Sequence, residues 1–143
     1  MASPPLRAAF LLLPALLACE NRVSQCNDLV ALLNPHTEAM IHAVEDLAAV
    51  EAKPNAVDTW LTIMDQADSE VARLPLEDPR LAGFALRYRR QLADARAAAK
   101  TIKDAVAHGD AAGLHEGAKQ ADAFLDAQAT VLEELNTYCA AGR

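Results

Sequence analysis

The sequence predicts an all-α fold, an antiparallel up-down-up-down four-helix bundle that follows an N-terminal signal peptide. Apolar residues make up 52% of the 143-residue chain but aromatic residues only 4%, so alanine, leucine and valine dominate and favour closely packed helices. All seven prolines lie within the first 79 residues, so nothing in the last 64 forbids long helices. Apolar residues recur at alternating spacings of three and four in four segments, and no strand-like alternation competes.

The first 18 residues have the features of a signal peptide. Arg7 places a positive charge ahead of an apolar run of 11 residues, from Ala8 to Ala18. A helix that spans a bilayer needs about 20 apolar residues, so this run is too short for a permanent anchor. We therefore expect residues 1–18 to be removed on export, which leaves one domain over residues 19–143.

The residues around the expected cleavage site read Leu16-Leu17-Ala18-Cys19 and resemble the lipobox of bacterial lipoproteins. The resemblance implies that signal peptidase II cleaves before Cys19 and that this cysteine carries the acyl chains that attach the protein to a membrane. It also implies a place in the bacterial cell envelope, with the domain facing the periplasm or the exterior. Glu20 is not the aspartate that typically marks inner-membrane retention, which favours the outer membrane. The alternative is ordinary signal-peptide cleavage near Ala18, after which Cys19 remains a thiol.

The first predicted helix covers residues 21–52. The residues expected to face the core, which we call the seam of the helix, recur at spacings of three and four throughout. They are Val23, Cys26, Val30, Leu33, Thr37, Met40, Val44 and Leu47. Pro35 lies inside the segment, yet the phase holds across it. We expect either one helix kinked near Leu33 and Asn34 or two short coaxial helices.

Three further helices are predicted over residues 55–74, 79–108 and 111–139. Asp78 and Pro79 have the residue types of a helix N-cap and first position, and Gly109 with Asp110 is a natural stop and restart. The predicted seams are Val57, Trp60, Met64, Ala67, Val71 and Leu74; Leu81, Ala85, Tyr88, Leu92, Ala95, Ala99, Ile102 and Val106; and Leu114, Ala118, Ala121, Leu125, Gln128, Leu132, Leu135 and Cys139.

The second predicted helix is short, about 20 residues or roughly 30 Å, whereas its neighbours are near 30 residues or roughly 45 Å. The segment 75–78 can supply the missing length, because four extended residues span up to ~13 Å. Prolines at 75 and 79 bias the residues before them toward extended conformations. We expect Leu76 to turn inward where the second helix is missing.

The cysteines test this topology. Three cysteines in an exported chain leave an odd one, and if Cys19 carries lipid then Cys26 and Cys139 remain. Cys26 lies near the start of the first helix and Cys139 near the end of the fourth, and these ends are neighbours in an antiparallel bundle. A disulfide needs Cα atoms about 4.4–6.8 Å apart, which this topology can provide. We expect the disulfide in an oxidising compartment, and two buried free thiols are the alternative.

Charge is segregated along the chain. Residues 80–103 carry seven basic side chains and one acid, whereas residues 28–70 carry nine acids and one base. Four basic side chains of the third helix lie away from its seam and form one stripe, the basic stripe: Arg89, Arg96, Lys100 and Lys103. The stripe either pairs with acids of a neighbouring helix and aids solubility, or it is a docking face for an acidic envelope protein or anionic headgroups.

Other kinds of chemistry find no support in the residues. Ser24 and Ser69 have no paired histidine that could activate a nucleophile, and the four histidines lack the three or four converging ligands of a zinc site. We therefore expect no enzymatic activity, no cofactor and no bound metal. A net charge of −7 also argues against nucleic-acid binding, which depends on contacts with phosphate.

Two functions remain in competition. The first is a non-catalytic envelope lipoprotein that binds another envelope protein through a helix face. The second is a small-ligand or metal-binding helical bundle in the periplasm. A cavity lined by Val23, Phe84 and Leu135, at the end where the second helix is short, would favour the second function. A filled core there, capped by Leu76, would favour the first.

Overall fold

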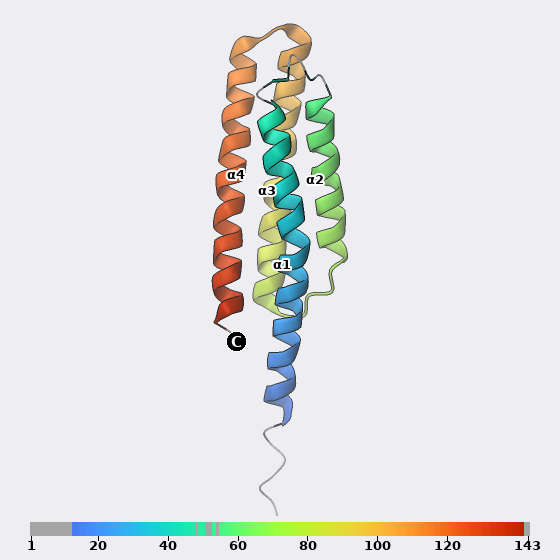
Figure 1. The fold of residues 1–143 in the computed structure, drawn as a ribbon, viewed down its shortest axis with the longest axis vertical. Coiled ribbons are helices and arrows are strands. Elements are labelled where there is room, and N and C mark those ends of the chain that lie inside the picture. The colour runs from blue at the N-terminus through green and yellow to red at the C-terminus, as the bar shows by residue number, and fades with distance from the viewer. Residues whose placement is uncertain (1–12, 48, 51–52, 54, 142–143) are drawn as a thin grey trace, which may run out of the picture.

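The computed structural model describes residues 13–47, 49–50, 53 and 55–141, with side chains from residue 21 onward. Within these ranges the chain forms no strand and four helices: α1 (Leu13–Leu47), α2 (Ala56–Arg73), α3 (Pro79–His108) and α4 (Ala111–Ala140). Each helix packs against the next, and α4 returns beside α1 (Figure 1). The predicted all-α four-helix bundle is confirmed.

Helix α1 is longer at its start, and shorter at its end, than the segment 21–52 expected from the seam. It begins at Leu13, runs through Cys19 and continues unbroken through Pro35. It projects beyond the bundle at the end where α4 stops and α3 begins (Figure 1). It ends at Leu47 in a turn, in which the backbone N–H of Val50 donates to the Leu47 carbonyl at 3.1 Å. The remainder of the expected signal peptide, residues 1–12, lies outside the described residues.

The connection from α2 to α3 is an extended strut, as the two prolines predict. Leu74 and Asp78 have ψ angles of 123° and 121°, and Leu76 packs against the core. Gln25 of α1 holds the strut in place, because its Oε1 accepts from the backbone N–H groups of Glu77 at 2.7 Å and Asp78 at 3.0 Å. The strut thus brings the chain back to the level of Cys26 before α3 begins.

The termini of α3 and the start of α4 follow the expected capping chemistry. The Asp78 carboxylate accepts from the backbone N–H groups of Arg80 at 2.8 Å and Leu81 at 3.0 Å. Gly109 ends α3 with a φ of 63°, a left-handed conformation that glycine adopts without strain. Asp110 then caps α4 by accepting from the N–H of Ala112 at 3.1 Å.

The expected seams of α2 and α3 lie largely in the core, whereas α1 and α4 each bury only four of their eight expected seam residues. In α4 the buried face keeps Ala121, Gln128 and Leu135 but moves by one residue at the positions before and between them. Leu125 and Leu132 were expected inside, whereas Phe124 and Val131 are the fully buried residues and Ala118 is exposed. Gly117 is buried instead of Ala118 and lies in close contact with α3, because a Cβ at position 117 would lie 2.3 Å from Cγ1 of Ile102. The close approach of α3 and α4 therefore requires glycine to face inward, which sets the rotation of α4.

A disulfide joins Cys26 of α1 to Cys139 of α4, with 5.8 Å between their Cα atoms. The expected pairing is confirmed, and it places the end of α4 beside the part of α1 that follows Cys19. Among the residues that the structure describes, no helix combines the length and the apolar character needed to cross a membrane.

Candidate functional site

The basic stripe of α3 faces α2, and three of its four members form ion pairs there. Nε of Arg89 lies 2.6 Å from Oδ1 of Asp68, and Nε of Arg96 lies 2.8 Å from Oδ1 of Asp65. Nζ of Lys103 lies 2.8 Å from Oδ1 of Asp58. The expected pairing between neighbouring helices is confirmed for these three residues. Lys100 is exposed, and its ammonium has no carboxylate within 4.0 Å among the described residues.

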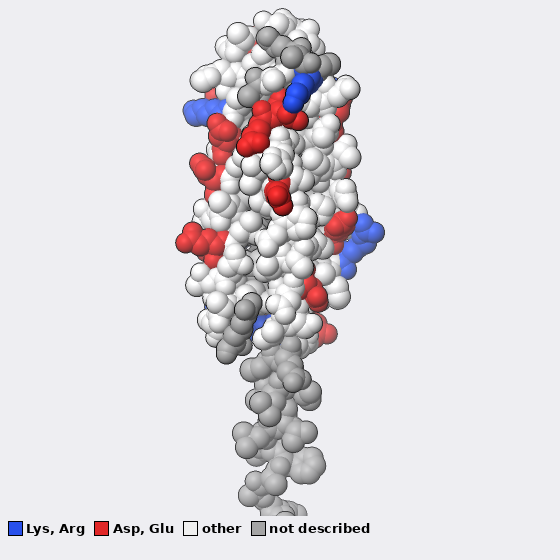
Figure 2. Space-filling model, in the orientation of Figure 1, with Lys and Arg blue, Asp and Glu red and all other residues white. Residues whose placement is uncertain are grey.

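Once these pairs are formed, acidic side chains predominate on the side of the bundle made by α3 and α4. Within the described residues, six carboxylates there have no basic group within 4.0 Å: Asp94, Asp104, Glu116, Asp122, Asp126 and Glu133. Four basic side chains of the same two helices are likewise without a carboxylate within 4.0 Å in this part of the chain: Arg80, which stacks on Tyr138, and Arg90, Lys100 and Lys119. Figure 2 shows acidic side chains spaced along the edge that α4 occupies in Figure 1. The charge that α3 and α4 do not use in ion pairs therefore has a modest negative excess.

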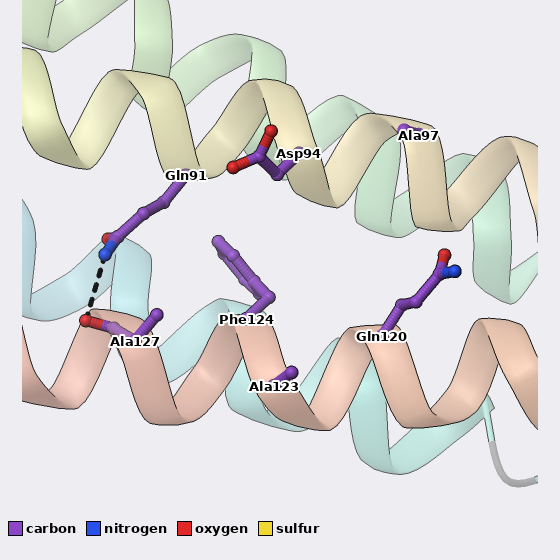
Figure 3. A pocket seen from close by; sticks show the side chains of 7 residues that line it. All are labelled: Gln91, Asp94, Ala97, Gln120, Ala123, Phe124 and Ala127. Atoms are coloured by element: carbon purple, nitrogen blue, oxygen red, sulfur yellow. Dashed lines mark hydrogen bonds between the residues drawn. The ribbon is translucent and has the colours of Figure 1, made fainter.

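A shallow hollow of about 420 Å³ lies between α3 and α4 on the same side (Figure 3). We call it the α3–α4 groove; its lining consists of Gln91, Asp94, Ala97, Gln120, Ala123, Phe124 and Ala127. Three alanines and the aromatic ring make it largely apolar, and Asp94 is its one charged residue. Nε2 of Gln91 donates to the carbonyl oxygen of Ala127 at 3.0 Å and thereby links the two helices.

Polar side chains from three helices meet in the core at mid-height of the bundle. Tyr88 contacts Thr37 and Gln128, and all three polar groups are buried without a well-formed hydrogen bond among the described residues. Burial raises the pKa of the Tyr88 hydroxyl, and the contacts with Thr37 and Gln128 offset part of that rise. Thr37 and Gln128 are polar residues at predicted seam positions, and this is the feature of the sequence that indicates polar groups in the core. We call these three residues the buried polar layer.

The end of the bundle beside the α1 extension carries an aromatic and arginine cluster. The guanidinium carbons of Arg22 and Arg80 lie 5.4 Å and 4.6 Å from the centre of the Tyr138 ring. The Tyr138 hydroxyl donates to Oδ2 of Asp78 at 2.8 Å. Burial alone would raise the pKa of Asp78, but the hydrogen bonds from the Leu81 backbone and from Tyr138 outweigh it and lower the pKa. The cluster closes the core at this end, and a second hollow of about 470 Å³ lies beside it.

The histidines do not converge on a metal-binding geometry. Nε2 of His36 lies 2.8 Å from Oε2 of Glu70, and this hydrogen bond lowers the pKa of the Glu70 carboxyl. His108 bonds the carbonyl oxygen of Asp104 in its own helix. In the part of the chain that the structure describes, no three histidine, cysteine, aspartate or glutamate side chains lie close enough to hold a metal ion together.

The comparisons with known proteins add no match to this geometry: no protein-family model, no curated protein and no solved structure matches this chain. The Cys19 side chain, expected to carry lipid, lies outside the described residues, although its backbone is part of α1.

Proposed function

We propose that the chain is a lipid-tethered, non-catalytic helix bundle of the bacterial cell envelope that binds another protein. The tether is the acylated Cys19, seven residues before Cys26 on the same continuous helix. Seven helical residues span about 10 Å, so the acyl chains would enter the membrane close to the disulfide end of the bundle. The opposite end, where α3 turns into α4, would then lie farthest from the membrane.

The packing at the end where α2 is short supports protein binding over the alternative, a small ligand or metal held inside the bundle. Leu76 packs against the core where α2 is short, and Leu135 is fully buried there. Neither hollow described above is lined by Val23 or Leu135, the residues around which an internal cavity was expected. Space and unpaired charge lie instead on the outer side of α3 and α4. That single observation, an open hollow on a surface with unused charge, carries the proposal.

The tether is tested by the intact mass of the protein extracted from membranes, measured with and without reductant. We expect loss of residues 1–18, an added diacylglycerol and acyl mass on Cys19, and a gain of two hydrogen atoms on reduction. A Cys19→Ser chain is the matched control and should keep residues 1–18, because signal peptidase II requires the lipidated cysteine. An unacylated, soluble product from the natural chain would remove the membrane tether.

Protein binding is tested separately in the same membranes by a photo-crosslinking residue placed on different faces. Position 123 lies in the α3–α4 groove, whereas position 72 is exposed on α2. We expect a discrete larger adduct from position 123 and none from position 72. Equal labelling from both positions, or none from either, would contradict a binding surface on α3 and α4 whatever the state of Cys19.

A further inference from the structure

We infer that the α3–α4 groove is a docking site for a basic helical segment of a partner protein. The inference rests on the protein-binding function proposed above and adds the surface and the charge of the partner. The inferred partner is basic, whereas the basic stripe led us to expect an acidic partner. The difference arises because three of the four residues of the stripe form ion pairs with α2.

The shape of the groove fits a helix rather than a rigid globular surface. Small side chains, Ala97 on α3 and Ala123 and Ala127 on α4, leave a hollow between two antiparallel helices. Phe124 contributes an apolar floor and is itself only 5% exposed, so it can make contact without moving out of the core. Between Gln91 and Ala97 the groove extends for about 9 Å along α3, which is roughly two turns of an added helix.

The charge of the groove selects a basic occupant. Asp94 lines the groove from its α3 side, and its carboxylate lies above Phe124 in the view of Figure 3. No lysine or arginine nitrogen lies within 4.0 Å of its carboxylate among the described residues. A lysine or arginine of the partner can lay its aliphatic stem over the alanines and Phe124 while its charged group pairs with Asp94.

Exposed acids elsewhere on α3 and α4, outside the groove itself, add to the negative charge of the two helices. Asp122 and Asp126 of α4 and Asp104 of α3 are exposed and have no basic group within 4.0 Å in the described part of the chain. Arg90 and Lys119 oppose them only in part. Complementary charge of this kind speeds association and selects the partner more than it adds affinity, so a basic helix is favoured over an acidic one.

The test uses the chain from Glu20 onward and synthetic helical peptides. Every buried residue of the described core and the disulfide lie between Gln25 and Cys139, so this chain keeps the folded bundle without its lipid. The first probe is an 18-residue amphipathic peptide of leucine, alanine and lysine. The second is the same peptide with each lysine replaced by glutamate. Binding is measured by calorimetric titration at low and at physiological ionic strength.

We expect the lysine peptide to bind at least tenfold more tightly than the glutamate peptide and to weaken as salt is added. Asp94→Asn should weaken its binding by up to about fivefold, the range expected of one exposed ion pair. Ala123→Arg should abolish binding, because it fills the groove and neutralises the charge of Asp94. Ala129→Arg is the matched control, since position 129 is exposed on α4 outside the groove and the change in net charge is the same.

Several outcomes would overturn the inference. Equal losses in Ala123→Arg and Ala129→Arg would mean that net charge alone attracts the peptide. Tighter binding of the glutamate peptide, lost in the Arg89→Glu, Arg96→Glu double variant, would restore the basic stripe as the docking face. Concentration-dependent dimerisation that Ala123→Arg prevents would make a second copy of the chain the occupant. A protein that is acylated and crosslinks in membranes but ignores both peptides would lose this inference and keep the proposed function.

Discussion

At the scale of single residues, the buried polar layer is the least expected feature of the core. Gln128 is completely buried, and neither its amide nitrogen nor its oxygen forms a well-formed hydrogen bond among the described residues. Tyr88 and Thr37 are the other two members of the layer, so α1, α3 and α4 each contribute one polar side chain. Burial of an amide without partners costs about 1–3 kcal/mol in proteins. The layer therefore lowers stability, and it favours the one helix register that brings its members together.

Replacement of Gln128 by leucine should stabilise the bundle. Leucine keeps most of the volume and removes the two unpaired polar atoms, so we expect the free energy of unfolding to rise by about 1 kcal/mol. Gln91→Glu is the control with the opposite sign, because it keeps the shape of the side chain but replaces the N–H group that donates to Ala127, and it should cost about 0.5–1.5 kcal/mol. Urea denaturation followed by circular dichroism measures both. A loss of stability in Gln128→Leu would show that the amide is well hydrogen-bonded in solution.

The phase of α4 shows what the sequence could not determine at this scale. Apolar or small residues occur in adjacent pairs, Gly117 with Ala118, Phe124 with Leu125 and Val131 with Leu132, so two seams one residue apart fit the same pattern. The structure buries the first member of each pair. The choice depends on contact with α3, which the periodicity of α4 alone does not contain.

At the scale of the helices, the close packing of α3 on α4 depends on one glycine. The Cβ of an alanine at position 117 would meet Cγ1 of Ile102 at 2.3 Å and its backbone nitrogen at 3.3 Å. Cγ1 is bonded directly to the Cβ of Ile102 and the nitrogen belongs to the α3 backbone, so neither can move away as the tip of a flexible side chain can.

Gly117→Ala and Gly83→Ala should therefore change stability in opposite directions. Alanine favours a helix interior over glycine by about 1 kcal/mol, and nothing lies within 4 Å of a Cβ at position 83, so Gly83→Ala should stabilise by about 0.5–1 kcal/mol. Overpacking at position 117 should exceed this gain and give a net loss of about 1–2 kcal/mol. Thermal and urea unfolding of the two variants compare the effects. A stabilised Gly117→Ala would mean that α3 and α4 separate at little cost.

The strut between α2 and α3 shows what the sequence could determine for an element. The short second seam, the two prolines and the need to align Cys26 with Cys139 together predicted an extended segment with Leu76 facing inward, and the structure has it. The clamp by Gln25 could not be predicted, because Gln25 occupies a polar position next to the seam of α1. Its buried side chain becomes meaningful only when the strut passes over it.

At the scale of the whole molecule, the disulfide fixes the relation between the first and last helices. It spans a sequence separation of 113 residues. In the chain-entropy model, closing a loop of that length removes enough freedom from the unfolded chain to stabilise the fold by about 4–5 kcal/mol, and measured values run lower. Packing of α1 on α4 is less extensive than packing of α3 on α4, so this is the interface that gains most from a covalent link.

The Cys26→Ala, Cys139→Ala double variant should lose about 2–4 kcal/mol of unfolding free energy. Addition of reductant to the natural chain should produce a loss of similar size, and it should leave the double variant unchanged. Urea denaturation with and without reductant measures both effects. Equal stability of all four samples would contradict the disulfide as a major contribution to the fold.

The bundle, its chain order and its disulfide could all be predicted, because heptad spacing and cysteine positions act over long stretches of sequence. The α3–α4 groove could not, since it depends on which small side chains remain uncovered once α4 takes its rotation. The ion pairs of the basic stripe could not be predicted with certainty either, because they require Asp58, Asp65 and Asp68 to lie on the face of α2 that meets α3. Lipidation and partner binding stay predictions.

The bond between Cys26 and Cys139 also changes what a cut in the backbone would do. A protease that opens the strut at Leu76, or the turn after α1, would divide the polypeptide into two pieces. Both pieces would remain one covalent molecule, because the linkage encloses α2, α3 and most of α1 and α4 in a ring. In a compartment rich in degrading enzymes, such a nicked molecule would not shed half of its core, and it would keep whatever tether the start of α1 provides.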